Sequence, residues 1–239
     1  MHSDLSEHAT TSGIVPLGES SGKEPTIYGH RFTPLQQARR EQVWQTLCRD
    51  FFQALVPLDS TLVDVGAGDG HFVRNIHAAR RIAVDVSPHV LPLAQEGIEV
   101  IQASATAFAS SIGGQADIVF MSNFLEHLPH KNLVLEVLEE SARALRKGGR
   151  IIILQPNIRH LGAAYWDYID HHIALTDQCL TEALDVTGFR VTRVVSRFLP
   201  YTIKSRAGSF SWLLPLYLRL PWAWRFFGKQ SLIIAEKVN

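Results

Sequence analysis

The sequence has little cysteine and no long apolar run, and each absence excludes a class of protein. Cys48 and Cys179 are its two cysteines, and their separation matches no metal-binding or redox spacing. Such cysteine usage is typical of a reducing compartment, so we expect a cytoplasmic protein. The most apolar stretch, residues 211–227, is interrupted by two prolines and two arginines. It is therefore too short to cross a bilayer as a helix.

Net charge is also absent. Lys and Arg together number 23, as do Asp and Glu, so no global field attracts nucleic acid. This balance hides a basic C-terminal third, because no carboxylate occurs between Asp185 and Glu236. The first residues are rich in Ser, Gly and Thr and lack the apolar core of a secretory signal. We expect a flexible leader over residues 1–30, followed by one domain over 31–239.

Apolar runs and helical stretches alternate along most of this domain. A helix over 34–55 precedes strands expected at 61–65, 81–86, 99–102, 116–121 and 150–155, with helices at 71–79, 88–96 and 133–145 between them. A helix over 176–187 and strands at 189–198 and 231–238 follow. Strands rich in Ile and Val without polar alternation suit a sheet covered on both faces. The order predicts an α/β fold with a doubly wound, mostly parallel seven-stranded sheet.

A glycine-rich turn, DVGAGDG at residues 64–70, follows the first expected strand. A dinucleotide-binding fingerprint would place its third glycine at position 71, where this chain has His71. The Gly-Lys-Ser/Thr ending of a triphosphate-binding loop is absent too. Two carboxylates, Asp64 and Asp69, flank the turn instead. They favour a cofactor that carries a cationic end and no phosphates.

Asp85, at the end of the second expected strand, indicates a nucleoside. An acid at this distance from the glycine turn can accept hydrogen bonds from both ribose hydroxyls. The alternative is that Asp85 caps the Ser87-Pro88 turn. Its place 15 residues after Gly70 favours the ribose role.

Four motifs carry a family resemblance: DVGAGDG at 64–70, Asp85, SNFLEHL at 122–128 and LRKGGR at 145–150. With this order and spacing, the chain resembles the class I S-adenosylmethionine-dependent methyltransferases. The resemblance implies that the glycine turn borders the methionine part of the cofactor, that Asp85 holds the ribose and that the end of strand four faces the sulfonium. The cofactor-binding residues that it implies are Asp64, Gly66, Ala67, Gly68, Gly70, Asp85, Val86, Ser104, Ala105 and Asn123. The family's frequent acid after strand three is absent, and Ser104 takes its place.

The acceptor is inferred from further absences. No Asn/Asp-Pro-Pro-aromatic stretch for amines in DNA follows strand four, and no Pro-Cys pair for pyrimidine carbons occurs. With balanced charge, a small-molecule or glycan acceptor is favoured, and most simply a hydroxyl oxygen of it. A hydroxyl must lose its proton, and histidine is the natural general base. The candidates are His127, His171 and His172, with helix capping or a solvated turn as the alternative interpretation.

The segment 165–176, AYWDYIDHHIALT with its preceding alanine, gathers aromatic, acidic and imidazole side chains. We expect Tyr165, Trp166 and Asp170 to bind a polyhydroxylated acceptor, although a lid that only excludes water is an alternative. Metal binding by Asp170, His171 and His172 is a weaker idea, because adjacent ligands rarely complete a site alone. We therefore expect no metal. The segment also resembles that of methyltransferases associated with bacterial surface glycan or natural-product assembly.

The expected domain has a cofactor-binding core at 59–157, a lid and helix at 158–188, and the last two strands at 189–239 with a helical insertion at 199–228. The insertion has two interpretations. Trp212, Leu213, Leu216 and Leu220 pack on the core as a cap, or the segment meets anionic lipid at a membrane surface. A protein that binds the cofactor without catalysis is an alternative to the enzyme. An NAD-linked oxidoreductase is disfavoured by the glycine register.

Overall fold

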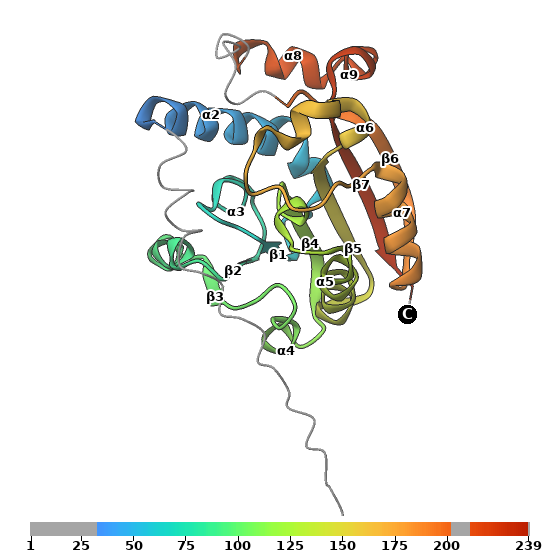
Figure 1. Cartoon of the computed structure of the whole chain (residues 1–239). Helices are drawn as coiled ribbons and strands as arrows, with labels where there is room; N and C mark the ends of the chain where they lie inside the picture. Colours follow the sequence, from blue (N-terminus) through green and yellow to red (C-terminus); the bar gives the residue numbers. More distant parts are fainter. Residues whose placement is uncertain (1–32, 202–210, 239) are drawn as a thin grey trace, which may run out of the picture. The chain divides into compact units, whose positions relative to one another are not determined.

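The fold is given by a computed structural model that describes residues 33–201 and 211–238. The leader expected at 1–30 lies outside the described residues, as does part of the insertion. The described residues from Pro34 onward belong to one compact unit, and they are drawn in colour in Figure 1.

A seven-stranded sheet runs through this unit in the order β3-β2-β1-β4-β5-β7-β6. Its strands are β1 (Thr61–Val65), β2 (Arg80–Asp85), β3 (Glu99–Gln102), β4 (Ala116–Ser122), β5 (Leu145–Pro156), β6 (Phe189–Leu199) and β7 (Gln230–Lys237). The first five pair in parallel, and β7 runs antiparallel to both β5 and β6. The doubly wound fold expected from the sequence is confirmed.

Helices cover both faces of the sheet (Figure 1). On one face lie α4 (Ala109–Ile112), α5 (Lys131–Ala144) and α7 (Asp177–Val186); on the other lie α2 (Pro34–Asp50), the 3₁₀ segment η1 (Phe52–Leu55) and α3 (His71–Asn75). Alternate residues of a strand therefore enter different cores, as Leu62 and Val63 do. Fully burying one such side chain contributes about 1.5–3 kcal/mol.

Four expected elements differ from the observed ones, and the first is the helix expected at 34–55, which ends at Asp50. The helix expected at 71–79 ends at Asn75. The segment expected as a helix at 88–96 is the 3₁₀ helix η2 (Pro88–Glu96), because Pro92 inside it has no N–H to donate. The strand expected at 150–155 begins earlier, at Leu145, so the LRKGGR motif is part of β5, whose register shifts against β4.

The connections at the carboxyl ends of the parallel strands are short helical segments. They are η3 (Leu125–His127) after β4, and α6 (Ile158–Leu161) with η4 (Gly162–Asp167) after β5. Residues 158–176 are called the lid segment below. Because the carboxyl ends of parallel strands share one edge of the sheet, η3 and the lid segment meet there.

The insertion between β6 and β7 contains η6 (Ser211–Leu213), α8 (Leu214–Leu218) and α9 (Pro221–Phe227). Figure 1 shows α8 and α9 side by side next to α2. The residues that pack inward are Leu214, Tyr217, Leu218, Ala223 and Trp224. The cap expected from the sequence is thus present, but Trp212 and Leu216, two residues expected to pack, are exposed instead.

Gly228 closes the junction between α9 and β6. A Cβ at this position would lie 2.5 Å from the Arg197 carbonyl carbon, 2.6 Å from the Trp224 oxygen and 2.8 Å from the Phe198 nitrogen. All three are backbone atoms, which cannot move aside as a flexible side chain can. The junction therefore requires glycine at position 228.

We expect Gly228→Ala to lower the free energy of unfolding by roughly 1–3 kcal/mol, because the added methyl group overlaps backbone. Urea unfolding measures this. Gly113→Ala is the matched control, since position 113 has a left-handed φ of 70° but open space around a Cβ. The control substitution should lower the free energy of unfolding by about 1 kcal/mol, because of its left-handed backbone conformation alone. Equal effects of the two substitutions would contradict a tight junction.

Candidate active site

The glycine turn after β1 is shaped by close contacts on two sides. Gly66, Gly68 and Gly70 all have a left-handed φ, at 70°, 52° and 75°. A Cβ at Gly66 would lie 2.5 Å from the Phe124 ring, and one at Gly70 would lie 2.5 Å from Leu93. At Gly68 a Cβ would meet nothing within 4 Å. The turn therefore has one open side, where a ligand can approach the backbone closely.

Asp85 joins this turn to the end of β2. Its Oδ2 accepts a hydrogen bond from the Gly68 N–H at 2.8 Å, and its Oδ1 accepts one from the Ser87 N–H at 2.8 Å. Each carboxylate oxygen keeps a further acceptor site, so the pair fits two ribose hydroxyls. The cap of η2 is Ser87, whose side chain accepts from His89, so Asp85 is not the helix cap itself.

Both acids that flank the turn interact with other groups of the protein. Asp64 is buried, and burial, followed by the nearby Asp85 charge, raises its pKa to about 8, while a hydrogen bond from the Val73 N–H opposes this rise. Asp64 therefore binds the first turn of α3. Asp69 lies 3.4 Å from the Arg40 guanidinium, which offsets its charge. The acidic field expected from the sequence is thus weaker than the two carboxylates alone indicate.

Helix α2 holds the glycine turn, a role that the sequence did not reveal. Glu41 accepts a hydrogen bond from Asn75 Nδ2 at 2.7 Å and lies 2.7 Å from His71 Nδ1. Both partners belong to α3, whose N-terminus follows the turn. No sequence pattern indicates these contacts, because 30 or more residues separate the partners in the chain.

The other expected cofactor residues border the same edge of the sheet. Val86 is exposed directly after Asp85, and Ser104 bonds locally to Thr106, with 2.9 Å between the two hydroxyl oxygens. Ala67 and Ala105 are half-buried against the two cores. Asn123 has a φ of 48°, the one left-handed non-glycine residue in the described part of the chain. Its Oδ1 is buried and accepts no hydrogen bond from a described residue, so this oxygen can serve a ligand donor.

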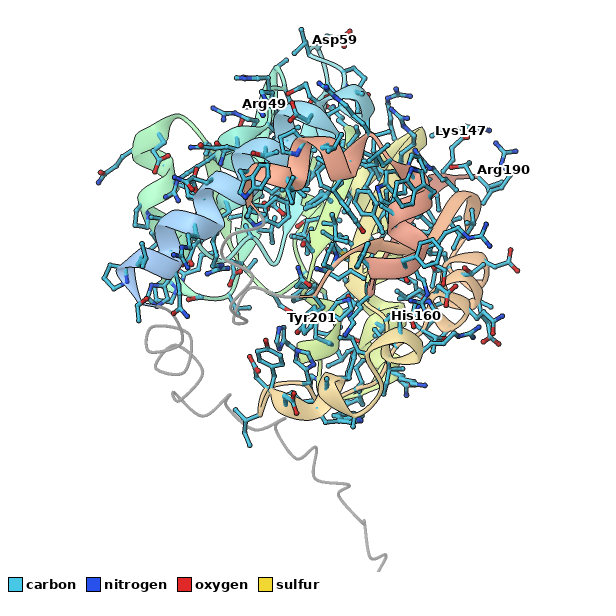
Figure 2. The ribbon with its side chains drawn as sticks, turned by 90° about the horizontal axis from the view of Figure 1, so that it is seen from above. Arg49, Asp59, Lys147, His160, Arg190 and Tyr201 are labelled. Carbon is cyan, nitrogen blue, oxygen red and sulfur yellow. The ribbon has the colours of Figure 1, made fainter. Side chains whose placement is uncertain are left out.

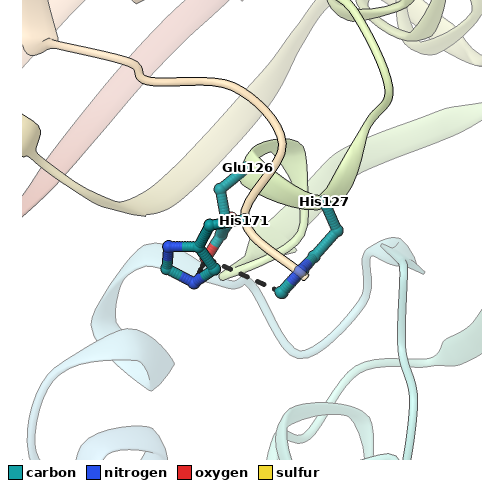
Figure 3. Close-up of side chains that lie close together, drawn as sticks. All are labelled: Glu126, His127 and His171. Carbon is teal, nitrogen blue, oxygen red and sulfur yellow. Dashed lines mark ion pairs between the residues drawn. The ribbon is translucent and has the colours of Figure 1, made fainter. Parts of the chain in front are cut away.

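A buried cluster of one carboxylate and two imidazoles follows β4. Glu126 Oε1 lies 3.9 Å from His127 Nε2 and 4.0 Å from His171 Nε2 (Figure 3). Glu126 is fully buried, and this burial raises the pKa of its carboxyl, against the opposing effects of His127 and of Gln155. Gln155 Nε2 donates to Glu126 Oε2 at 2.9 Å. Two segments far apart in sequence, η3 and the lid segment, thus supply one cluster.

The protonation of His127 follows from its main-chain partner. His127 Nδ1 lies 2.7 Å from the carbonyl oxygen of Asp170, and a carbonyl can only accept, so Nδ1 carries the proton. In the neutral ring Nε2 then has a lone pair. The Asp170 carboxylate lies 3.4 Å from the same Nδ1. The His127 ring therefore has Nε2 as a hydrogen-bond acceptor and a carboxylate beside Nδ1.

Two aromatic side chains, one from the lid segment and one that follows β6, contact His171. Tyr168 stacks on the His171 ring with 5.0 Å between centroids. Tyr201, which follows β6, lies with its hydroxyl 3.3 Å from His171 Nε2 (Figure 2). Neither Tyr201 nor Glu126 was assigned a role from the sequence, although Glu126 belongs to the SNFLEHL motif.

Two sequence-predicted residues are not in the cluster. The His172 side chain is exposed, and only its backbone N–H contributes, by donating to the Glu126 carbonyl at 2.9 Å. Tyr165 was expected to bind the acceptor, but it is fully buried and its hydroxyl donates to the Ile173 carbonyl at 2.8 Å. The buried Tyr165 side chain therefore anchors the lid segment, of which it is part, to the protein interior. Trp166 remains exposed and Asp170 partly so.

The ligand atoms of Glu126, His127 and His171 all lie within 4.8 Å of one another, which is close enough to consider a metal ion. With bonds of about 2.1 Å, adjacent ligand atoms of a tetrahedral site lie about 3.4 Å apart. The observed 3.9 and 4.0 Å are longer, and the Tyr201 hydroxyl already contacts His171 Nε2. This geometry favours an acid–base cluster over a preformed metal site.

Comparisons with known proteins agree with this geometry. Residues 63–153 match a family described as a methyltransferase domain. A SAM dependent methyltransferase from Archaeoglobus fulgidus superposes with a TM-score of 0.60 at 18% identity, covering 91% of this chain and 100% of that one. An S-adenosylmethionine dependent methyltransferase from Mesorhizobium loti has a TM-score of 0.56 at 17% identity, covering 78% and 95%.

A third structure, described as a possible histamine N-methyltransferase from Thermotoga maritima, has a TM-score of 0.58 at 18% identity and covers 90% of this chain and 93% of that one. Among curated protein sequences, none matches. At these identities the structures establish the fold, and the family match covers β1 to β5.

The fold and the glycine turn with its acidic strand end define a nucleoside-binding α/β domain. Residues 63–153 match a methyltransferase domain, and the chain as a whole has the fold of S-adenosylmethionine-dependent methyltransferases; both findings support S-adenosylmethionine as the cofactor.

Asp85→Ala should weaken S-adenosylmethionine binding roughly 10- to 100-fold, because it removes a charged acceptor worth about 1.5–3 kcal/mol. Gly68→Val should do the same by filling the open side of the turn. Isothermal titration calorimetry measures both affinities. Asp59→Ala, at an exposed position, is the control and should bind as the parent does. Unchanged affinity in both site variants would refute the placement of the cofactor.

Asp64 should make stability depend on pH. Its folded pKa of about 8 exceeds the ordinary value, so the native state binds more protons than the unfolded chain between about pH 4 and 8. The free energy of unfolding therefore falls as pH rises through this window. Asp64→Asn lacks this loss, so its stability relative to the parent should increase with pH by up to a few kcal/mol. Urea unfolding at several pH values measures the difference, which would stay constant if Asp64 titrated normally.

Proposed function

We propose that the chain methylates a hydroxyl oxygen of a small-molecule or glycan acceptor, with His127 as the general base. The observation that carries this proposal is the orientation of His127. Its Nδ1–H is held by the Asp170 carbonyl at 2.7 Å, which leaves the Nε2 lone pair for a proton. A hydroxyl acceptor needs such a base, because its oxygen must lose a proton as it is methylated.

S-adenosylmethionine supplies a methyl group activated by its sulfonium. With the cofactor bound, the acceptor oxygen would form its new bond to carbon as the sulfur–carbon bond breaks, and His127 Nε2 would take the hydroxyl proton. The ring then carries a positive charge. The Asp170 carboxylate, 3.4 Å from Nδ1, and Glu126, 3.9 Å from Nε2, stabilise that charge.

Glu126 and His171 complete the proton-handling cluster. Burial raises the pKa of the Glu126 carboxyl, so this group takes up a proton more readily than an exposed glutamate. Its Oε1 faces both imidazoles, at 3.9 and 4.0 Å. These distances exceed a hydrogen bond by about 1 Å, which a small side-chain rotation would close. The cluster can therefore pass the proton away from His127 after each turnover.

The cofactor is held by the residues that the resemblance implied. Asp85 accepts from the two ribose hydroxyls, while the open side of Gly68 and the unsatisfied Asn123 Oδ1 border the methionine part. Val86 offers an exposed apolar surface for the adenine ring, beside Ser104. These positions leave the reactive end of the cofactor at the exit of β4, beside His127.

The acceptor is bound by the exposed part of the lid segment. Trp166 is exposed, and Tyr168 presents a ring stacked on His171. Aromatic faces suit the apolar face of a sugar ring, and Asp170 can accept from its hydroxyls. This combination supports a polyhydroxylated acceptor.

His127→Ala should lower kcat by roughly 10²- to 10⁴-fold while S-adenosylmethionine affinity stays near the parent value. His172→Ala is the matched control, because its exposed ring lies outside the cluster and its backbone N–H is retained. The assay uses a panel of sugar and phenolic acceptors, with detection of S-adenosylhomocysteine and of the mass increment of one methyl group.

Three other outcomes would contradict this proposal. If His127→Ala turns over as fast as His172→Ala, alignment alone drives transfer and an amine acceptor is favoured. Loss of activity on chelation, restored by a divalent ion, would make the cluster a metal site. Cofactor binding without turnover on any acceptor would favour a non-catalytic protein.

A further inference from the structure

The insertion has an outward surface that methyl transfer does not explain. Large apolar side chains there are exposed to an unusual extent: Trp212 by 73%, Leu216 by 54%, Trp222 by 60% and Phe226 by 72%. Single exposed apolar residues are common on proteins, but a group of them in two adjacent helices marks an interaction site.

These side chains share one side of each helix with arginines. In η6 and α8, Leu216 and Arg219 follow Trp212 by four and seven residues; in α9, Arg225 and Phe226 follow Trp222 by three and four residues. Such intervals place residues on the same side of a helix. These six residues are called the α8–α9 face.

The opposite sides of both helices are firmly packed. Tyr217 donates its hydroxyl to the Phe198 carbonyl at 2.6 Å, and Trp224 donates Nε1 to the Tyr217 carbonyl at 2.8 Å. The Trp224 ring also lies edge-on to Phe198, with 5.0 Å between centroids. The α8–α9 face is thus turned outward by the fold, because the helices cannot bury both sides.

We propose that the α8–α9 face binds the surface of an anionic membrane. Short helices that carry Trp, Phe and Leu together with basic residues lie in the plane of a bilayer interface, with their apolar side chains among the headgroups. Arg219, Arg225 and Lys229 are exposed, and no carboxylate occurs between Asp185 and Glu236. Asp50, which lies near Arg219, is paired with Arg49 at 2.7 Å.

Charge distinguishes this occupant from a second copy of the chain. A symmetric dimer would place the same face on both sides of the interface, so the arginines of two copies would approach each other without a carboxylate from this segment. An anionic bilayer supplies the opposite charge instead. The part of the chain that the structure describes contains no helix that could span a bilayer.

The surface is connected to the active site through both ends of the insertion. Tyr201, at the start of the insertion, contacts His171, and the Lys229 carbonyl, at its end, accepts a hydrogen bond from the N–H of Asn157, directly before the lid segment, at 3.0 Å. A chain bound through α8 and α9 therefore holds the carboxyl edge of its sheet near the lipid surface.

The test is co-sedimentation of the full chain with phosphatidylcholine vesicles, with and without phosphatidylserine. The parent should bind the anionic vesicles preferentially, and binding should fall as salt rises. Arg219→Gln with Arg225→Gln should weaken the partition coefficient by about thirtyfold, which corresponds to about 1 kcal/mol per basic residue. Trp222→Ser with Phe226→Ser should reduce binding to both kinds of vesicle.

Leu58→Ser with Lys147→Gln is the matched control. It removes an exposed apolar side chain just before β1 and an exposed basic side chain in the first residues of β5, both outside the insertion, and should bind as the parent does. Thermal unfolding verifies that every variant is folded, and cofactor affinity should be unchanged throughout.

The proposal is overturned if the parent does not bind anionic vesicles at low salt, or if the site variants bind as well as the control. It is also overturned if sedimentation shows a stable dimer that Trp222→Ser dissociates. Each result is independent of methyl transfer, so failure here leaves the proposed function intact.

Discussion

The candidate active site depends on one buried main-chain oxygen. The carbonyl of Glu126 accepts hydrogen bonds from the backbone N–H groups of His172 and Ile173, at 2.9 and 3.3 Å. These two bonds join the lid segment to the exit of β4. Without them His171 would not face Glu126, and the Asp170 carbonyl would not reach the His127 ring. The same residue that offers a buried carboxylate thus also fixes, through its backbone, the loop that carries its partners.

A second set of contacts fixes the cofactor side. The Asp85 carboxylate bonds to the Gly68 N–H, and α2 holds the opposite end of the turn through Glu41 and His71. The end of β2 and helix α2 therefore hold the turn in place before any ligand binds. Such pre-organisation lowers the entropic cost of ordering the turn when a ligand binds. It also explains why a turn made mostly of glycine can be well defined, although glycine alone is permissive.

The insertion shows how one segment can satisfy two demands. Its inward side chains cover the core beside α2, while its outward side chains remain apolar. The sequence predicted a packed cap and a lipid-facing segment as alternatives. In the structure the two are compatible, because each helix has an inner and an outer side. The residues expected to pack were partly the wrong ones, since Trp212 and Leu216 face outward and Tyr217 and Trp224 face inward.

Local patterns in the sequence determined the fold class, the glycine turn and the position of Asp85. Each of these depends on residues that lie close together in the chain. They also placed His127 at the exit of β4. What only the tertiary structure decided are contacts between distant residues. Glu126 with His171, Asp69 with Arg40 and Tyr201 with the lid segment are of this kind, and so is the burial of Tyr165, whose side chain reads from sequence like a binding residue. Spacing along the chain carries no information on which loop folds over which strand end, and that packing selects His171 over its neighbour His172 for the cluster.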